Sequence, residues 1–471
     1  MTSNKPVTLA TRLGLAGVVF FGLAYMAPGI VQSTFGVVSE ASHGVAPTAY
    51  LVATGAMLLT GLSYAALARR LPSAGSAYSY AGTLLGRGAG FLVGWVILLD
   101  YLFLPMVAWL IQSVYLNAQF PGVPIWGWLL LNIGLTTGIN VLGIVLADRV
   151  NKALTVLALG GIVVSALVIV GYLVGRPAPE LAPAIWNPGT SIVAVTSAAA
   201  IAAYSFLGFD AISTLSEETK NPRKTIPRGI LLTLLIGGVI FVVVSGLMQL
   251  AHPGGTFEIA DTAGYTISIT TGGQMFADVL NLVGIVGGFA SGLAIQATSS
   301  RLLYVMGRDG VLPGRLFGRL SHRFRVPWIN VVLIGAIGLL ATTLDIAQAT
   351  SLINFGAFLA FTAVNISYVT LLWKTRKPVS LPLRVLASIP AVLGAIVDIV
   401  LLTQLHASAQ AIGAVWLALG IGYLALVTRG FRRPVPKATE GGRSSSADGS
   451  EPEHAPLGVL KQEDDGIPDR V

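Results

Sequence analysis

Long apolar runs recur along almost the entire chain and restrict its possible folds more than any other feature. Each run has about 18 to 25 residues, enough for an α-helix to cross the ~30 Å hydrocarbon core of a bilayer. We count about twelve such runs between residues 14 and 427. Backbone polar groups must be paired inside hydrocarbon, so these segments are expected to be helical. The sequence therefore predicts an all-α membrane protein with about 12 transmembrane helices.

The composition agrees with a protein that resides in the lipid bilayer and argues against an enzyme. Only 11% of the 471 residues are charged, against about 25% in soluble domains. The chain has no cysteine, and its five histidines lack metal-ligand spacing. Neither a phosphate-binding loop nor a nucleophile–base pattern is visible. We therefore expect no metal, no cofactor and no enzymatic activity.

The net charge of +8 is explained by membrane topology rather than by binding to nucleic acid. If the apolar runs alternate in direction from a cytoplasmic N-terminus, all of the 29 Lys and Arg residues except Arg176 fall on the cytoplasmic side. This asymmetry is the one expected from the positive-inside rule. The sequence predicts a multi-pass protein of the bacterial inner membrane with both termini in the cytoplasm.

The sixth apolar run is interrupted. It starts at Ser191 and gives way at Tyr204 to the polar, glycine-containing sequence SFLGFD, which ends at Asp210. Such a break is tolerated at membrane depth only where it lines a cavity or is buried in protein. An aspartate at a helix centre costs about 2.5 to 3.5 kcal/mol on insertion scales. Asp210 is therefore expected at a functional site; the alternative is a satisfied structural carboxylate near the inner end of the helix.

Two further helices carry unusual residues. The first, residues 14–38, contains Pro28 and Gly29, which predict a second interruption, a simple kink being the alternative. The third, residues 90–115, contains Asp100, about 15 to 18 Å from the inner end and so near the bilayer midplane.

The two interrupted helices open consecutive sets of five spans that run in opposite directions. This 5+5 inverted repeat is typical of secondary transporters, whose substrate binds where the breaks meet. The predicted organisation is a tail at residues 1–13, a ten-helix transport core at 14–373, helices 11 and 12 at 374–429 and a disordered cytoplasmic tail at 430–471.

Several segments resemble the amino acid–polyamine–organocation superfamily of transporters, and within it the putrescine importer subgroup. The superfamily segments are residues 75–80, 205–227 (SFLGFDAISTLSEETKNPRKTIP) and 301–313 (RLLYVMGRDGVLP). The subgroup segments are residues 22–25 (GLAY), 94–95, 99–105 (LDYLFLP), 205–219 and 300–309. The resemblance implies a LeuT-like fold that imports a small diamine by alternating access, coupled to an ion gradient.

The chemistry of an organic dication predicts which residues bind it. Asp100 and Asp210 supply negative charge, and no Lys or Arg lies deep in the core. Of five candidate rings we expect two or three to line the site through cation–π contacts. These rings are Tyr25, Tyr101, Tyr204, Phe206 and Phe209. The predicted substrate-binding set is Tyr25, Ala27, Pro28, Gly29, Asp100, Tyr101, Tyr204, Phe206, Gly208 and Asp210.

The resemblance assigns further roles and leaves alternatives open. It implies that Tyr204 acts as an aromatic gate and that Asp210 takes part in proton coupling. Pro28 removes a backbone donor where relatives bind a carboxylate, which favours a substrate without one. We favour a proton over sodium as the coupling ion. Some proton-coupled relatives have a lysine well inside the fifth helix, whereas this chain has Ala158 or its neighbours there. Sodium would need oxygen ligands such as Thr298 and Ser299.

Two other functions are compatible with the sequence. One is an amino acid permease or exchanger of the same fold. The other is an amine-sensing membrane receptor without flux. The sequence does not define the oligomeric state.

Overall fold

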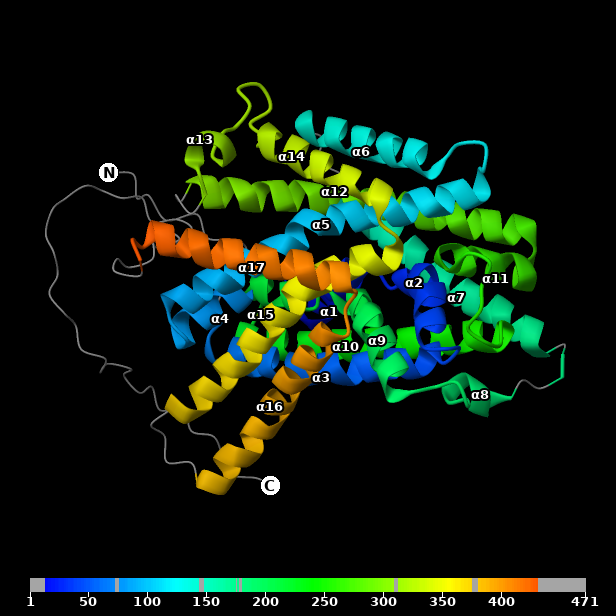
Figure 1. The fold of residues 1–471 in the computed structure, drawn as a ribbon, viewed down its shortest axis with the longest axis horizontal. Coiled ribbons are helices and arrows are strands. Elements are labelled where there is room, and N and C mark those ends of the chain that lie inside the picture. Colours follow the sequence, from blue (N-terminus) through cyan, green and yellow to red (C-terminus); the bar gives the residue numbers. More distant parts are fainter. Residues whose placement is uncertain are drawn as a thin grey trace, which may run out of the picture. The chain divides into compact units, whose positions relative to one another are not determined.

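The computed structural model describes residues 13–72, 76–143, 148–174, 176–177, 180–308, 312–374 and 380–430, without the side chains of residues 148–152 and 217. The predicted disordered tail from residue 431 onward and the first 12 residues lie outside this range. The described chain is almost entirely helical (Figure 1).

Nine helices in the described residues are long and apolar enough to cross a membrane. They include α3 (Ala46–Arg70), α5 (Arg87–Gln119), α7 (Asp148–Val174), α10 (Pro222–Ala251), α12 (Gln274–Arg308), α15 (Ile346–Lys374), α16 (Leu381–Thr403) and α17 (Ala407–Val427). The ninth is the apolar stretch Ile192–Ser216. A tenth span is formed if α1 (Leu15–Met26) and α2 (Ile30–Ala41), which meet at 51°, are counted together. Two shorter apolar helices, α6 (Ile125–Val141) and α14 (Trp328–Gly338), coincide with the two remaining predicted spans.

Both predicted interruptions are present. In the first, α1 ends at Met26, and Ala27 adopts the left-handed conformation with φ of 45° before α2 begins. In the second, α9 (Ile192–Ala202) tightens into the 3₁₀ helix η1 (Ala203–Phe206). Gly208 then takes φ of 104°, and a second 3₁₀ helix, η2 (Asp210–Glu217), follows. The interrupted sixth span thus changes from α to 3₁₀ geometry at Ala203.

Several short helices lie between the long apolar spans. α4 (Ser76–Leu84) follows α3 and packs on α5 and α15. Between α10 and α12 lie η3 (Ala260–Thr262) and α11 (Ala263–Gly272). Their sequences are too short or too polar to span a membrane, so hydropathy alone does not reveal them. The other short elements are α8 (Leu181–Ile185), α13 (Gly314–Phe317) and η4 (Leu339–Thr343).

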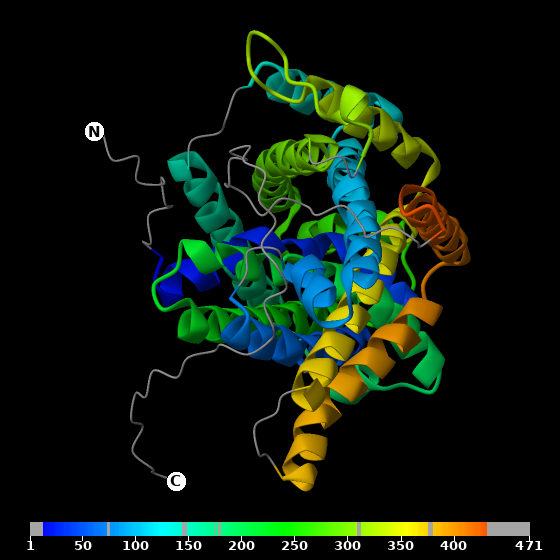
Figure 2. The ribbon, with the colours of Figure 1, turned by 90° about the vertical axis from the view of Figure 1, so that its left-hand side faces the viewer.

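Close helix packing depends on small residues. The most extensive contact joins α3 and α10, which run side by side (Figure 1). A Cβ at Gly61 would overlap Leu234, and a Cβ at Gly238 would overlap Thr54. Membrane helices lack a hydrophobic drive toward one another, so glycines that permit such approach stabilise their association. On another side of the bundle, α6 and α14 lie together (Figure 2).

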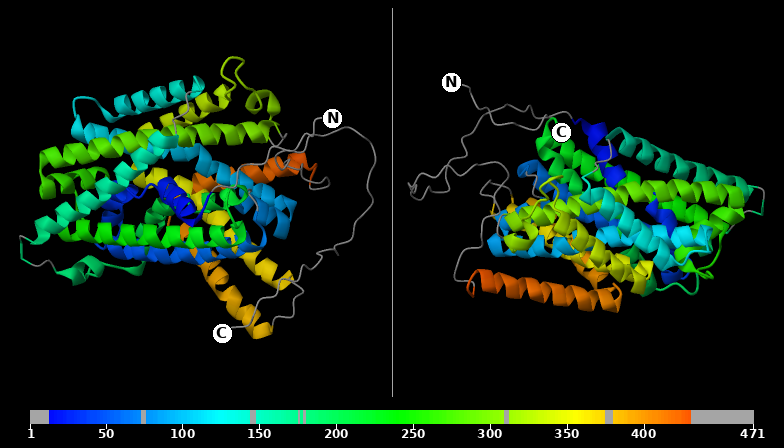
Figure 3. Two further views of the ribbon diagram at one scale, coloured as in Figure 1. Left: turned by 180° about the vertical axis from the view of Figure 1, so that it is seen from behind. Right: turned by 90° about the horizontal axis from the view of Figure 1, so that it is seen from above.

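The last helix, α17, is fixed to α5 by a reciprocal tryptophan pair. Trp95 Nε1 donates to the Trp416 carbonyl, and Trp416 Nε1 donates to the Trp95 carbonyl, each at 2.9 Å. The two rings are stacked with centroids 4.9 Å apart. α17 lies at one edge of the described helices (Figure 3), and this pair satisfies both indole donors there.

Candidate functional site

A cavity of about 340 Å³ lies beside the break between α1 and α2. Residues of α2, α5, α7, α11 and α12 complete its lining. Five of the predicted substrate-binding residues line it directly: Tyr25, Ala27, Pro28, Gly29 and Tyr204. No Lys or Arg of the described chain is among the lining residues. The cavity is therefore compatible with a cationic occupant.

The break in the first span leaves backbone oxygens free. Pro28 has no N–H, and the N–H of Ile30 turns to the Ala27 carbonyl at 2.9 Å. As a result, no backbone N–H of the described residues pairs with the carbonyls of Ala24, Tyr25 and Met26. All three residues line the cavity. Carbonyl oxygens in this position can accept hydrogen bonds from an ammonium group or coordinate a small cation.

A second free acceptor lies in α5 next to Asp100. Pro105 is inside the helix and cannot donate to the carbonyl four residues earlier, which belongs to Tyr101. One carboxylate oxygen of Asp100, Oδ1, is buried without a hydrogen-bond partner. Buried polar atoms are normally paired, so an unpartnered carboxylate oxygen indicates a missing ligand or proton.

Asp210 is in a different environment. Backbone N–H groups of residues 208, 210 and 211 interact with its carboxylate, while the Ala211 N–H donates to the Gly208 carbonyl at 3.1 Å. These nearby backbone dipoles offer partial compensation for a carboxylate beside the break, which favours the structural alternative considered for Asp210. Asp210 can still take part in transport, but Asp100 is the better candidate for direct contact with an ammonium group.

The acidic and tyrosine side chains of the predicted set form one electrostatic cluster. Asp100 interacts electrostatically with Asp210, and Tyr204 interacts with Asp100. Tyr25 interacts with both carboxyl groups and with Tyr101. Asp100, Tyr101 and Asp210 do not line the cavity themselves but lie beside Tyr25, which does. Tyr25 is therefore the link between the cavity and the acidic pair.

Gly208 joins the two interrupted helices through Tyr25. Its φ of 104° lies in a region that side chains with a Cβ rarely adopt. A Cβ on Gly208 would also overlap Cδ1 of the Tyr25 ring. The absence of a side chain at residue 208 thus allows the break in the sixth span to pack against the end of α1.

Phe206 and Phe209 are not at the cavity. Both are fully buried; Phe206 packs edge-on against Phe241, with ring centroids 4.9 Å apart. Phe209 lies 5.4 Å from Tyr64 and 5.2 Å from Phe361. Phe206 ends η1, whereas Phe209 follows Gly208 with its φ of 104°, so an irregular turn directs both rings into the core. We therefore omit Phe206 from the proposed substrate contacts.

The residues considered for proton or sodium coupling differ in whether they line the cavity. Ala158 lines the cavity, and no charge is present there. Thr298 also lines it, but its hydroxyl donates to the Ala294 carbonyl at 2.9 Å. The Ser299 hydroxyl is buried without a partner. The side chain of Lys152 lies outside the described residues.

The structure adds polar lining residues that sequence reasoning missed. Gln112, Tyr115 and Asn281 also line the cavity. Tyr115 donates to the Gln32 carbonyl at 3.1 Å, and Asn281 donates to the Tyr115 carbonyl at 2.9 Å. On a helix of about 3.6 residues per turn, residue 115 lies about 60° from Asp100 and residue 112 about 120° from it. Helical periodicity counted from Asp100 would therefore have indicated Tyr115, whereas Gln112, and Asn281 on α12, required the structure.

The short helices η3 and α11 pack against α2. Glycine at residue 36 admits the Ala260 carbonyl, and glycine at residue 264 lies against the Gln32 carbonyl. Burial and the nearby Asp345 raise the pKa of Asp261 to about 6, with a smaller contribution from Glu40. The Ile346 N–H donates to Asp261 and opposes this rise in pKa.

The raised pKa of Asp261 predicts that the packing of this segment on α2 weakens as pH rises. Because the packed state favours the protonated carboxyl, its stabilisation is present at low pH and is lost as pH passes about 6. Amide hydrogen exchange of residues 260–272, corrected for intrinsic rates, should be faster at pH 7.5 than at pH 5. The variant Asp261→Asn should show slow exchange at both values. Equal pH dependence in the variant would exclude Asp261 as the cause.

The fold and the cavity define a multi-pass membrane transporter with two interrupted helices. Residues 17–430 match the family model described as amino acid permease. The low-affinity putrescine importer PlaP of Escherichia coli strain K12 is 40% identical over 440 residues, covering 92% of this chain and 97% of that protein. The chain therefore belongs to the amino acid permease family, in the putrescine importer subgroup of its superfamily, and is a transporter rather than an enzyme.

More distant relatives share the architecture. The branched-chain amino acid permease BcaP of Bacillus subtilis strain 168 is 26% identical, covering 68% of this chain and 72% of that one. A crystal structure of the Eremococcus coleocola manganese transporter, in complex with an aromatic bis-isothiourea substituted compound, has a TM-score of 0.51 at 15% identity. That comparison covers 92% of this chain and 99% of the other. At this identity it supports the fold alone.

Proposed function

We propose that the protein imports putrescine or a closely related small diamine across the bacterial inner membrane by alternating access. The observation that carries this proposal is the unpartnered Asp100 carboxylate oxygen in one electrostatic cluster with Asp210 and Tyr25, beside a cavity without basic lining residues. The 40% identity to a putrescine importer supports the same substrate class.

The proposed site binds an ammonium group in three ways. Asp100 offers its free carboxylate oxygen, and the carbonyls of Ala24, Tyr25 and Met26 offer further acceptors. The rings of Tyr25 and Tyr204 line the same cavity and provide cation–π contact. Tyr204 is proposed as the gate on the outer side of the substrate.

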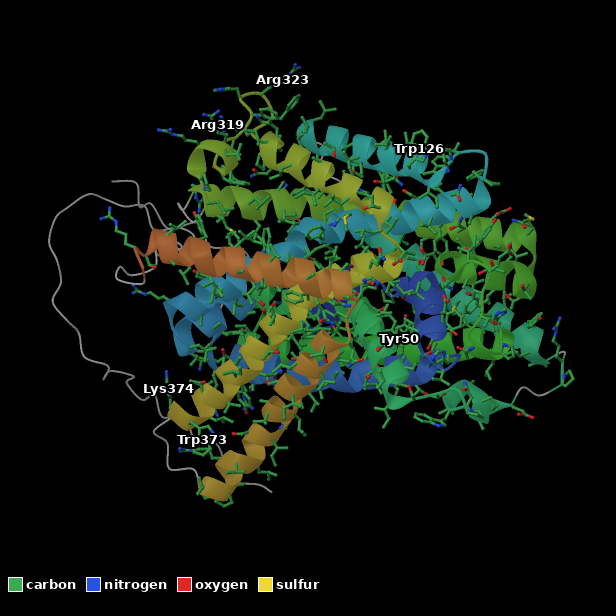
Figure 4. The ribbon with its side chains drawn as sticks, viewed as in Figure 1. Tyr50, Trp126, Arg319, Arg323, Trp373 and Lys374 are labelled. Carbon is green, nitrogen blue, oxygen red and sulfur yellow. The ribbon has the colours of Figure 1, made fainter. Side chains whose placement is uncertain are left out.

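The transport core is proposed to be residues 14–373, with both chain termini in the cytoplasm. Arg319 and Arg323 precede α14, and Lys374 ends α15 (Figure 4). Lys374 also donates to the Leu84 carbonyl at the end of α4, at 2.9 Å. Basic residues at these ends agree with a cytoplasmic assignment.

An amino acid substrate is the second candidate. The Gly29 N–H has no backbone acceptor within the described residues, so it could bind a carboxylate despite the donor that Pro28 lacks. The likeness to a branched-chain amino acid permease favours the same alternative. Competition by amino acids but not by diamines would select it.

The direct test is uptake of radiolabelled putrescine into proteoliposomes under an inward proton gradient and without sodium. We expect accumulation that collapses when an uncoupler is added. Uptake that appears only with sodium would overturn the proposed ion. Transport of an amino acid but not of putrescine by correctly oriented protein would overturn the proposed substrate.

The variant Asp210→Asn tests the proposed role in proton coupling. We expect it to fold and to exchange putrescine across the membrane, but to lose accumulation driven by the proton gradient, because the amide cannot cycle a proton. Uptake and counterflow should be compared in the same proteoliposomes. Asp345→Asn, at an exposed acidic residue, is the matched control. Full accumulation by a well-expressed Asp210→Asn protein would remove Asp210 from the coupling mechanism.

A further inference from the structure

Asp398 is a buried carboxyl group that the proposed transport site does not use. It lies in α16, outside the ten-helix core, and its side chain is 0% exposed. An acidic side chain within a membrane helix is costly and rarely present without a partner or a role. From the sequence, its position outside the ten-helix core favours packing or a subunit contact over a role in transport.

Two neutral side chains hold one oxygen of Asp398. Oδ2 accepts hydrogen bonds from Thr60 Oγ1 and Asn365 Nδ2, each at 3.0 Å. Asn365 Nδ2 also donates to Thr60 Oγ1 at 2.9 Å. A Cβ at Gly394 would lie only 2.9 Å from Asn365 Nδ2, so glycine at this residue lets Asn365 approach α16. The cluster ties α16 to α3 and α15.

The hydrogen bonds of this cluster are one donor short. Asp398 Oδ1 and Asn365 Oδ1 are both buried and have no partner among the described residues. An ionised carboxylate only accepts hydrogen bonds, whereas a protonated one also donates one. If Asp398 is protonated, its O–H supplies the missing donor, and the cluster contains an unpartnered acceptor, Asn365 Oδ1. Protonation also removes a negative charge from a site with no described cationic partner.

We propose that Thr60, Asn365 and Asp398 form a proton-binding site, separate from the substrate site, that fastens α16 to α3 and α15. The proton resides on the Asp398 carboxyl. Its release leaves an uncompensated charge in the helix interface and weakens that contact. The proposal does not depend on the identity of the transported substrate.

Tyr64 connects this site to the acidic cluster of the transport site. It lies one turn after Thr60 on α3, and its hydroxyl is buried without a partner. It interacts electrostatically with both Asp210 and Asp398. Neutral side chains of the described residues also contact α16: Asn365 and Trp373 from α15, the latter beneath Arg384 of α16, and Ser197 from α9, which donates to Gln404 at 2.9 Å. Tyr64 is therefore a titratable group within electrostatic range of both carboxyl groups.

Infrared difference spectroscopy of the full-length protein in nanodiscs tests the proton directly. The wild-type protein at pH 6 should show a protonated-carboxyl C=O band that is absent from Asp398→Asn and unchanged in Asp345→Asn. Gly394→Ala, which pushes on Asn365 without changing a titratable group, should shift the frequency of this band. If Asp398→Asn does not fold, the shift in Gly394→Ala still assigns the band.

Thermal stability gives an independent readout. The amide of Asp398→Asn supplies a donor at every pH, so this variant should keep its stability between pH 6 and pH 9, whereas the wild type should lose stability. Identical carboxyl bands in wild type and Asp398→Asn would overturn the proposal. Stabilisation of the wild type but not of Asp398→Asn by added sodium would instead identify a metal-cation site and overturn the proton assignment.

Discussion

Replacing Asp100 by Asn is expected to weaken putrescine binding by about 30-fold to several thousand-fold, the equivalent of about 2 to 5 kcal/mol for one lost member of a buried charge pair. The amide matches the carboxylate in size but offers no charge to an ammonium group. Asp100 is preferred over Asp210 because its Oδ1 is buried without a partner, whereas backbone N–H groups interact with the Asp210 carboxylate.

Binding of labelled putrescine to purified protein, measured by scintillation proximity, separates this effect from coupling. The control variant Asp345→Asn should bind normally because residue 345 is exposed. Asp100→Asn should remain monodisperse and at least as heat-stable as the wild type, since removing a buried charge does not destabilise the fold. Wild-type affinity in Asp100→Asn would show that the ammonium group binds elsewhere.

The second large effect is expected from Gly208→Ala. A side chain at φ of 104° costs about 1 to 3 kcal/mol, and its overlap with the Tyr25 ring costs about 1 to 3 kcal/mol more. The variant should therefore lose heat stability, and putrescine transport should fall below detection because Tyr25 is displaced from the cavity. Thermal unfolding followed by tryptophan fluorescence, together with uptake, measures both consequences.

Two further variants isolate the contact with Tyr25. Gly171→Ala, in α7, adds the same methyl group where no atom lies within 4 Å, and it should leave stability unchanged or slightly raised. Adding Tyr25→Leu to Gly208→Ala should restore part of the stability but not transport. If the double variant is no more stable than Gly208→Ala, the overlap with Tyr25 is not the cause of the loss.

Sequence reasoning identified the features that follow from local chemistry. Apolar run length predicted the helical spans, because a bilayer of fixed thickness selects helices of that length. Pro28 and the polar sequence before Asp210 predicted the two interruptions, because neither segment can satisfy its backbone as a regular helix. Burial costs marked Asp100 and Asp210 as unusual without showing what either contacts.

Other features required the tertiary structure because they depend on contacts between distant residues. Which of the aromatic rings near residue 206 reach the cavity depended on a local change from α to 3₁₀ geometry. No residue in the sequence predicts that change. The different states of Asp100 and Asp210 depended on which backbone donors reach each carboxylate. The hydrogen bonds of Asp398 could be identified only from the structure, because they come from Thr60 and Asn365, which are separated by 305 residues in the sequence. Sequence thus determined which groups are costly to bury, and packing decided which of them remain without partners.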